Sequence, residues 1–71
     1  MEWKVKYVSI SMKAARVNAG LTLEEAAKAL GINKNTLISY ESGKVSPRVD
    51  TAKKMSELYG IPISGINFFD L

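Results

Sequence analysis

The chain contains no cysteine and no histidine. Without cysteine it has neither a disulfide framework nor a thiolate metal site. Without histidine it lacks the side chain most often used as a general base and as a metal ligand. We therefore expect no enzymatic activity, no metal site and no cofactor.

Long apolar runs are also missing. No stretch approaches the roughly 20 residues that span a bilayer. Lys4 and Lys6 interrupt the region that would be apolar in a secretory signal. We therefore predict a cytoplasmic protein with no membrane partner.

The residues that are present fit one small folded domain. The 71 residues are 46% hydrophobic, which supports a core and argues against a disordered chain. Ten Lys and Arg against seven Asp and Glu give a net charge of +3. This modest excess is compatible with a polyanionic partner but does not require one.

Residues 1–10 are expected to form an arm or short strand ahead of a helical domain at 11–71. Apolar and basic side chains alternate here, which favours extended backbone: Trp3, Val5 and Tyr7 against Lys4 and Lys6. Together with Phe68 and Phe69, these three apolar residues are expected to lie outside the helical core, either covering the small bundle or forming an interface. The two lysines belong either to a phosphate-seeking arm or to a solvated tail.

Apolar periodicity and capping residues predict five short helices. Ser11, Thr22 and Asn33 can cap the first three helices, and glycine or proline stops each helix. Thr22 and Glu25 form a capping box, in which each side chain satisfies the other residue's backbone N–H. The expected ranges are 12–19, 22–31, 33–41, 49–59 and, as a last helix or turn, 64–68. The expected fold is therefore all-α, a compact bundle of about five short helices.

A candidate core follows from the apolar residues that recur on one side of each helix. Small side chains dominate the first two helices, and larger ones the next two. The residues expected to face inward are Met12, Ala15, Ala19, Ala26, Ala27, Leu30, Leu37, Tyr40, Val49, Ala52, Met55, Ser56 and Tyr59.

The most informative segment runs from Thr22 to Gly43, TLEEAAKALGINKNTLISYESG. It predicts two helices that cross closely over a tight turn, which requires small residues at the crossing and glycine in the turn. Ala27 and Gly31 stand at those places. The helix at 33–41 then has its apolar side chains on one side and, on the other, Lys34, Asn35, Ile38 and Ser39.

These four outward side chains can read base edges in a DNA major groove, which is about 12 Å wide. Asn35 can bond bidentately to adenine, Lys34 can reach guanine O6 or N7, and Ser39 can pair with either base. Ile38 is apolar, and our hypothesis is that it touches a thymine methyl group. Taken alone, these residues favour a plain solvated helix face. Placed after a capped helix and a glycine turn, they favour DNA reading.

The chain resembles the phage repressor/Cro-type helix-turn-helix regulators, also called Xre-like or lambda-repressor-like. The resemblance covers roughly residues 11–66. It is carried by Arg16 before Gly20-Leu21-Thr22, then Glu25-Ala26-Ala27, Leu30-Gly31-Ile32, Thr36-Leu37-Ile38, Tyr40-Glu41-Ser42-Gly43, Pro47 and Tyr59-Gly60-Ile61. It implies a lambda-repressor-like bundle with residues 33–41 as the recognition helix. It also implies an ion pair between Arg16 and Glu41.

The resemblance also implies DNA contacts at particular positions. Base contacts fall on Lys34, Asn35 and Ser39. Contacts to the DNA backbone orient the protein without specifying sequence, and fall on Thr22, Leu23, Asn33, Thr36, Ser42, Gly43, Lys44 and Arg48. One position departs from the family pattern, since Leu23 stands where many members carry glutamine. Leucine cannot hydrogen-bond to a phosphate or brace a base-reading side chain.

The sequence thus predicts a sequence-specific DNA-binding transcriptional regulator, a repressor of phage or prophage type. We expect it to bind double-stranded operator DNA with inverted-repeat symmetry, as a weak or DNA-induced homodimer. Repression is favoured over activation because so short a chain has little surface beyond these contacts. Two alternatives stay open. One is an antitoxin of the same fold that binds a toxin protein and its own promoter; the other is a protein-interaction module that has lost DNA binding.

Overall fold

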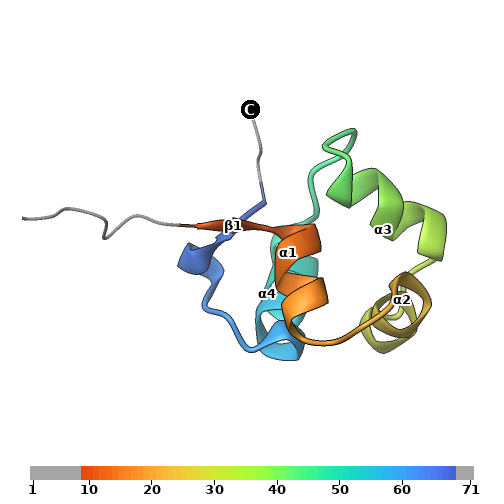
Figure 1. Cartoon of the computed structure of the whole chain (residues 1–71). Helices are drawn as coiled ribbons and strands as arrows, with labels where there is room; N and C mark the ends of the chain where they lie inside the picture. The colour runs from red at the N-terminus through yellow and green to blue at the C-terminus, as the bar shows by residue number, and fades with distance from the viewer. Residues whose placement is uncertain (1–8, 69–71) are drawn as a thin grey trace, which may run out of the picture.

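The computed structural model describes residues 9–68, which form four α-helices, one 3-10 turn and two very short strands (Figure 1). In chain order these are β1 (Ile10–Ser11), α1 (Met12–Asn18), α2 (Leu23–Leu30), α3 (Lys34–Glu41), α4 (Val49–Tyr59), the 3-10 turn η1 (Ile63–Gly65) and β2 (Ile66–Asn67). The predicted helical bundle is confirmed, with η1 near the place of the fifth helix. Within this described range, every helix falls short of the length and apolar character needed to cross a membrane. The aromatic and basic residues of the predicted arm, and Phe69, lie outside the described residues.

The two strands join the two ends of the described chain. Ile10 pairs with Ile66 and Ser11 with Asn67, in parallel, and Figure 1 shows this pairing beside α1. Sequence reasoning did not find it, because two-residue strands leave no alternating pattern to detect. The returning chain brings Ile66 and Phe68 into the core. The expectation that Phe68 lies outside the core is therefore wrong.

Local hydrogen bonds set the ends of α2 and the start of α3. The Thr22 hydroxyl accepts the Glu25 N–H at 3.1 Å, and the Glu25 carboxylate accepts the Thr22 N–H at 2.9 Å, so the capping box is confirmed. The Asn33 side-chain oxygen accepts the Asn35 N–H at 2.7 Å. Between these caps Gly31 has a φ of 73°, a conformation that a residue with a Cβ adopts only with strain. The tight turn between α2 and α3 depends on that glycine.

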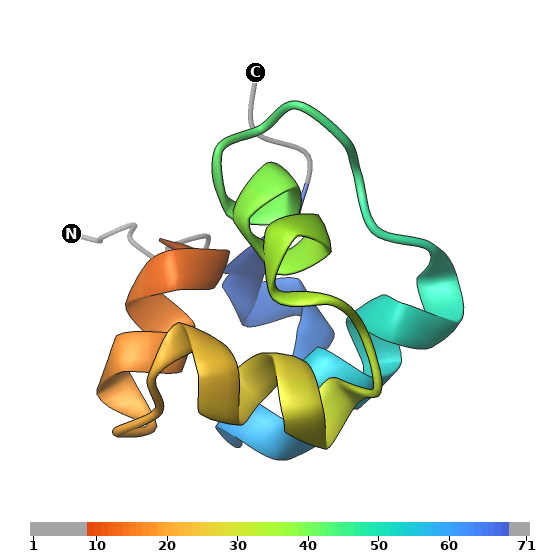
Figure 2. The same ribbon diagram turned by 90° about the vertical axis from the view of Figure 1, so that its right-hand side faces the viewer.

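The core lies where the four helices meet. Figure 2 shows α2 and α3 together on the near side, with α4 behind them. Leu37 of α3 and Met55 of α4 are the largest fully buried side chains. The small residues Ala26 and Ala27 let α2 pack closely against its neighbours. The buried hydrophobic residues are Met12, Ala15, Ala26, Ala27, Leu30, Leu37, Tyr40, Ala52, Met55, Tyr59, Ile66 and Phe68.

Three predicted inward positions are less buried than expected. Val49 begins α4 and is 71% exposed, and Ala19 is exposed just beyond the end of α1. Periodicity predicts which side of a helix a residue lies on. It does not predict whether a neighbouring element extends far enough to cover that residue. Ser56 is half-buried, and its hydroxyl donates to the Ile61 carbonyl at 2.7 Å, bracing the chain after α4.

The Tyr59 hydroxyl is buried and has no hydrogen-bond partner among the described residues. Burial raises the pKa of Tyr59 to about 12. The negative charge of Glu41 adds to the rise, while the positive charge of Arg16 opposes it. The folded protein therefore favours the neutral phenol.

We predict that Tyr59→Phe leaves the free energy of unfolding at neutral pH unchanged or raises it by up to about 1 kcal/mol, because it removes an unpaired buried polar group. In the wild type, stability should fall as pH rises from about 10 to about 12, because the unfolded tyrosine loses its proton first. Tyr59→Phe should lose less stability over this range. Urea unfolding of both proteins at neutral and alkaline pH measures this, and parallel alkaline curves would contradict it.

Candidate nucleic-acid interface

The outward side of α3 carries the residues predicted to read bases. Leu37 and Tyr40 are buried, which fixes the opposite side of the helix as the outer one. There Lys34, Asn35 and Ile38 are exposed, and Ser39 is half-buried. In Figure 2 this helix lies at the front of the molecule. The four side chains thus lie on one accessible helix, and their contact with DNA remains a prediction.

Lys34 is held by a carboxylate in this structure. Its Nζ lies 3.0 Å from Oε2 of Glu24, on the first turn of α2. The hydrogen bond from Lys34 lowers the pKa of the Glu24 carboxyl. The two side chains are 47% and 69% exposed, so water screens the pair and it contributes little to stability. It can open readily when a stronger acceptor approaches Lys34.

The residues predicted to contact the DNA backbone come from three places around α3. They lie at the start of α2, at the start of α3, and in the segment after α3: Thr22 and Leu23; Asn33 and Thr36; and Ser42, Gly43, Lys44 and Arg48. The oxygens of Thr22 and Asn33 already accept capping hydrogen bonds. The Thr22 hydroxyl keeps its own proton to donate. Lys44 and Arg48 are exposed cations, so they are the charged groups of this set that can meet a phosphate.

A buried ion pair joins the end of α3 to α1. Nε of Arg16 donates to Oε2 of Glu41 at 2.8 Å, and Nη2 donates to Oε1 at 3.3 Å. Nη1 donates to the Leu21 carbonyl at 2.8 Å. The two charged side chains are only 8% and 9% exposed. The pair implied by the resemblance is therefore formed, and it also ties down the loop before α2.

A hollow of about 280 Å³ lies over this ion pair. We call it the Leu23–Ile38 hollow, and its lining comes from α1, α2 and the end of α3: Lys13, Arg16, Leu23, Ile38, Glu41 and Ser42. Sequence reasoning named Leu23 and Ile38 separately but had no reason to join them, because no periodicity links two different helices. It missed Lys13 altogether, and no signal in the sequence distinguishes that residue from other surface lysines.

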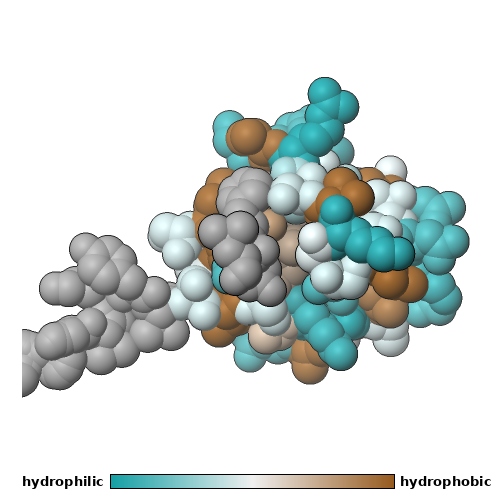
Figure 3. Space-filling view, turned by 90° about the horizontal axis from the view of Figure 1, so that it is seen from above, coloured by the Kyte–Doolittle hydropathy of each residue, from teal (hydrophilic) through white to brown (hydrophobic). Residues whose placement is uncertain are grey.

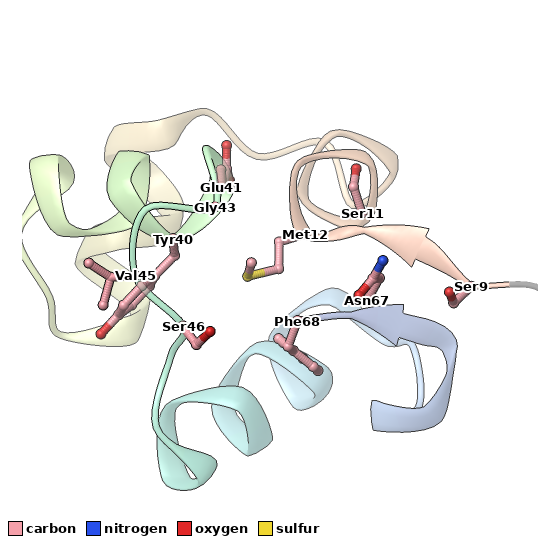
Figure 4. A pocket seen from close by; sticks show the side chains of 10 residues that line it. All are labelled: Ser9, Ser11, Met12, Tyr40, Glu41, Gly43, Val45, Ser46, Asn67 and Phe68. Carbon is pink, nitrogen blue, oxygen red and sulfur yellow. The ribbon is translucent and has the colours of Figure 1, made fainter. Parts of the chain in front are cut away.

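A second hollow, of about 140 Å³, lies on the side of the strand pair (Figure 4). Figure 4 shows Met12 and Phe68 pointing into it, with Tyr40 and Val45 at one end. Ser9, Ser11 and Ser46 also line it. None of the four predicted base-reading residues borders this hollow, so it lies outside the candidate interface.

Exposed large hydrophobic residues are scattered over the described surface. They come from different elements: Val17, Ile38, Val45, Val49 and Ile63. On the face seen in Figure 3, hydrophobic residues form separate spots among hydrophilic ones. Scattered apolar residues of this kind are normal on a protein surface. They do not mark a large permanent interface on that face.

Comparison with known proteins gives a consistent set of matches. A helix-turn-helix family model matches residues 12–66. The chain is 39% identical over 56 residues to the cryptic phage CTXphi transcriptional repressor RstR of Vibrio cholerae, covering 79% of this chain and 50% of that protein. It is 44% identical over 50 residues to the HTH-type transcriptional regulator ImmR of Bacillus subtilis, covering 70% and 39%. An uncharacterized HTH-type transcriptional regulator of Methanocaldococcus jannaschii is 34% identical over 59 residues, covering 83% and 89%.

The chain therefore spans about half the length, or less, of the two bacterial relatives that it matches. The archaeal relative is matched over nearly its whole length. No solved structure gives a significant match to the chain.

The buried ion pair generates a stability prediction. Glu41→Gln should lower the free energy of unfolding by about 3 to 5 kcal/mol, because it leaves the Arg16 guanidinium buried without its counter-charge. The matched control is Glu24→Gln, which breaks a solvent-screened, exposed pair and should lower the free energy of unfolding far less than Glu41→Gln does. Urea unfolding of the three proteins measures both effects. If both variants lose the same free energy of unfolding, burial of the Arg16–Glu41 pair does not determine its contribution to stability.

Proposed function

Because the chain belongs to the helix-turn-helix family, whose model matches residues 12–66, we propose that it is a sequence-specific DNA-binding transcriptional regulator, a repressor of phage or prophage type. The observation that carries the proposal is the exposure and orientation of α3. This helix presents an outward face suited to base edges and is fixed at its end by the buried Arg16–Glu41 pair. The Vibrio cholerae relative, named as a phage transcriptional repressor, supports the same proposal.

In the proposed complex α3 lies in the major groove. Lys34, Asn35 and Ser39 hydrogen-bond to base edges, and Ile38 makes an apolar contact. To reach guanine, Lys34 leaves Glu24, which costs little because that pair is exposed. Buried Leu37 and Tyr40 keep the opposite side of α3 fixed on the core.

Contacts to phosphates orient this helix. At the helix starts, the backbone N–H groups of Leu23, Asn33 and Thr36 bind phosphate oxygens. The Thr22 N–H is already bonded to Glu25, so Thr22 contributes its hydroxyl proton. The segment from Ser42 to Lys44 and the side chain of Arg48 complete the contacts beyond α3. Leu23 offers its backbone N–H but no side-chain amide, so the start of α2 provides fewer polar contacts than a glutamine there would.

We propose further that two copies act together on an inverted repeat. A single α3 reads only a few base pairs, and two copies related by a twofold axis supply the length of an operator. A stable interface buries roughly 1,200–2,000 Å² of matched surface. The exposed apolar residues of the described chain are scattered, which favours a weak dimer that forms fully only on DNA.

One observation favours the alternative of a protein-interaction module. Leu23 and Ile38 line one hollow, and apolar side chains that line a hollow can also bind the side chains of another protein. Salt dependence separates the two functions. Each phosphate contact should contribute a slope of about 0.9 in log K against log salt, whereas binding through an apolar protein face need show no such slope.

The central test is selection of bound duplexes from a random DNA pool at moderate salt. We predict recovery of an inverted repeat, because two α3 helices read equivalent half-sites. The variant with Lys34, Asn35 and Ser39 all changed to alanine should recover no such motif while remaining folded by circular dichroism, since these side chains are not part of the core. Recovery of no motif by the wild-type protein would contradict the proposed function.

Glu24 generates a second prediction about DNA binding. Glu24→Gln should bind the selected duplex up to about fivefold more tightly, because it removes an anion near the phosphates and frees Lys34 from an exposed pair. Glu57→Gln is the matched control. It makes the same change in net charge on an exposed residue of α4 and should leave affinity nearly unchanged. Weaker binding by Glu24→Gln would show instead that Glu24 positions Lys34 for its base.

A further inference from the structure

We propose that Leu23 and Ile38 together form a surface that reads the C5-methyl group of a pyrimidine in the major groove. The methyl group belongs to thymine or to 5-methylcytosine. This inference rests on the proposed DNA-binding function and adds a specificity residue, Leu23, at a position otherwise assigned only a backbone contact.

The two side chains approach the same space from different helices. Leu23 is the first residue of α2 and Ile38 lies in the middle of α3, and both line the Leu23–Ile38 hollow of about 280 Å³. Leu23 is half-buried and packs against the core. Ile38 is 40% exposed. Leu23 is therefore held by the core, whereas Ile38 still has apolar surface that an approaching group can cover.

The geometry places this hollow beside the base-reading face. Ile38 follows Lys34 by four positions, so the two side chains are neighbours on the same side of α3. Lys34 in turn reaches Glu24 at 3.0 Å, and Glu24 is next to Leu23 in the chain. A helix docked so that Lys34 meets a base edge therefore brings the hollow close to neighbouring bases.

The lining of the hollow is suited to an apolar group within a charged partner. Exposed Lys13 and Ser42 contribute polar groups to the lining, while the side chains of Leu23 and Ile38 offer no hydrogen bond. A polar base edge pressed against them would lose its hydrogen bonds to water without replacement. The C5-methyl group is the apolar group that the major groove presents. The net charge of +3 and the nearby lysines favour DNA over an apolar protein segment.

The buried ion pair makes this surface rigid. Arg16 and Glu41 also line the hollow, and their hydrogen bonds hold α1 and the end of α3 at a fixed separation. Leu23 follows the capping-box residue Thr22. The helix segments that carry the two apolar side chains are therefore held in position before DNA arrives.

The test uses the duplex selected by the full chain. Each thymine is replaced in turn by deoxyuridine, which pairs identically with adenine and lacks only the methyl group. We expect one or two positions per half-site at which wild-type affinity falls about fourfold, the effect of exposing one methyl-sized group. In Ile38→Ala, and in Leu23→Gln, which keeps a side chain of similar length, the penalty at those positions should disappear or shrink. Ile63→Ala, a similarly exposed isoleucine outside the hollow, should keep the full penalty.

A second set of duplexes distinguishes the two sources of the methyl group. Replacing cytosines by 5-methylcytosine should tighten wild-type binding if the hollow faces a cytosine, and should change nothing if it already faces thymine. A wild-type protein that binds every thymine and deoxyuridine duplex equally, with no gain from 5-methylcytosine, would overturn the inference while leaving the DNA-binding function intact. If Leu23→Gln loses as much affinity as the wild type when thymine is replaced by deoxyuridine, Leu23 does not take part in reading the methyl group. If the wild-type protein selects no duplex, both the proposed function and this inference are refuted.

Discussion

One arginine connects the parts on which the candidate interface depends. The guanidinium of Arg16 binds Glu41 through Nε and Nη2 and the Leu21 carbonyl through Nη1. These contacts join α1, the loop before α2 and the last residue of α3. A buried ion pair adds little net stability compared with a well-packed apolar pair, but losing one partner is costly. Its role here is therefore positional, since it fixes the end of the helix that carries the proposed reading face, the outward side of α3.

The other side of α3 is fixed by packing rather than by charge. Leu37 is fully buried and Tyr40 nearly so, and α2 approaches closely through its alanines and the turn at Gly31. The reading face and the core face belong to one eight-residue helix. Side chains on the outside can change without loss of the fold, whereas those on the inside cannot.

The first turn of α2 combines two opposing features. Glu24 is an exposed anion that binds Lys34, and Leu23 is an apolar residue at a helix start, where backbone N–H groups favour phosphate. Neither side chain can donate a hydrogen bond to a phosphate, because one is an ionised carboxylate and the other is apolar. Both instead act on α3, because Glu24 holds Lys34 and Leu23 shares a hollow with Ile38. This end of α2 is thus better suited to shaping the reading face than to clamping a phosphate.

The sequence by itself determined the local structure. The capping box at Thr22, the cap at Asn33 and the glycine at Gly31 act over three or four residues, so their positions in the chain are sufficient to place helix ends. The same short-range logic identified the outer face of α3. It could not identify the partner of Arg16, which is 25 positions away and came only from the family resemblance.

Only the tertiary structure decided the contacts between distant residues. It paired Ile10 with Ile66, buried Phe68, exposed Val49 and joined Leu23 to Ile38 in one hollow. None of these follows from periodicity, because each depends on the angle and distance at which two elements dock. Docking is set by the packing of all the core side chains together, whereas a helix end is set by a few neighbouring hydrogen bonds.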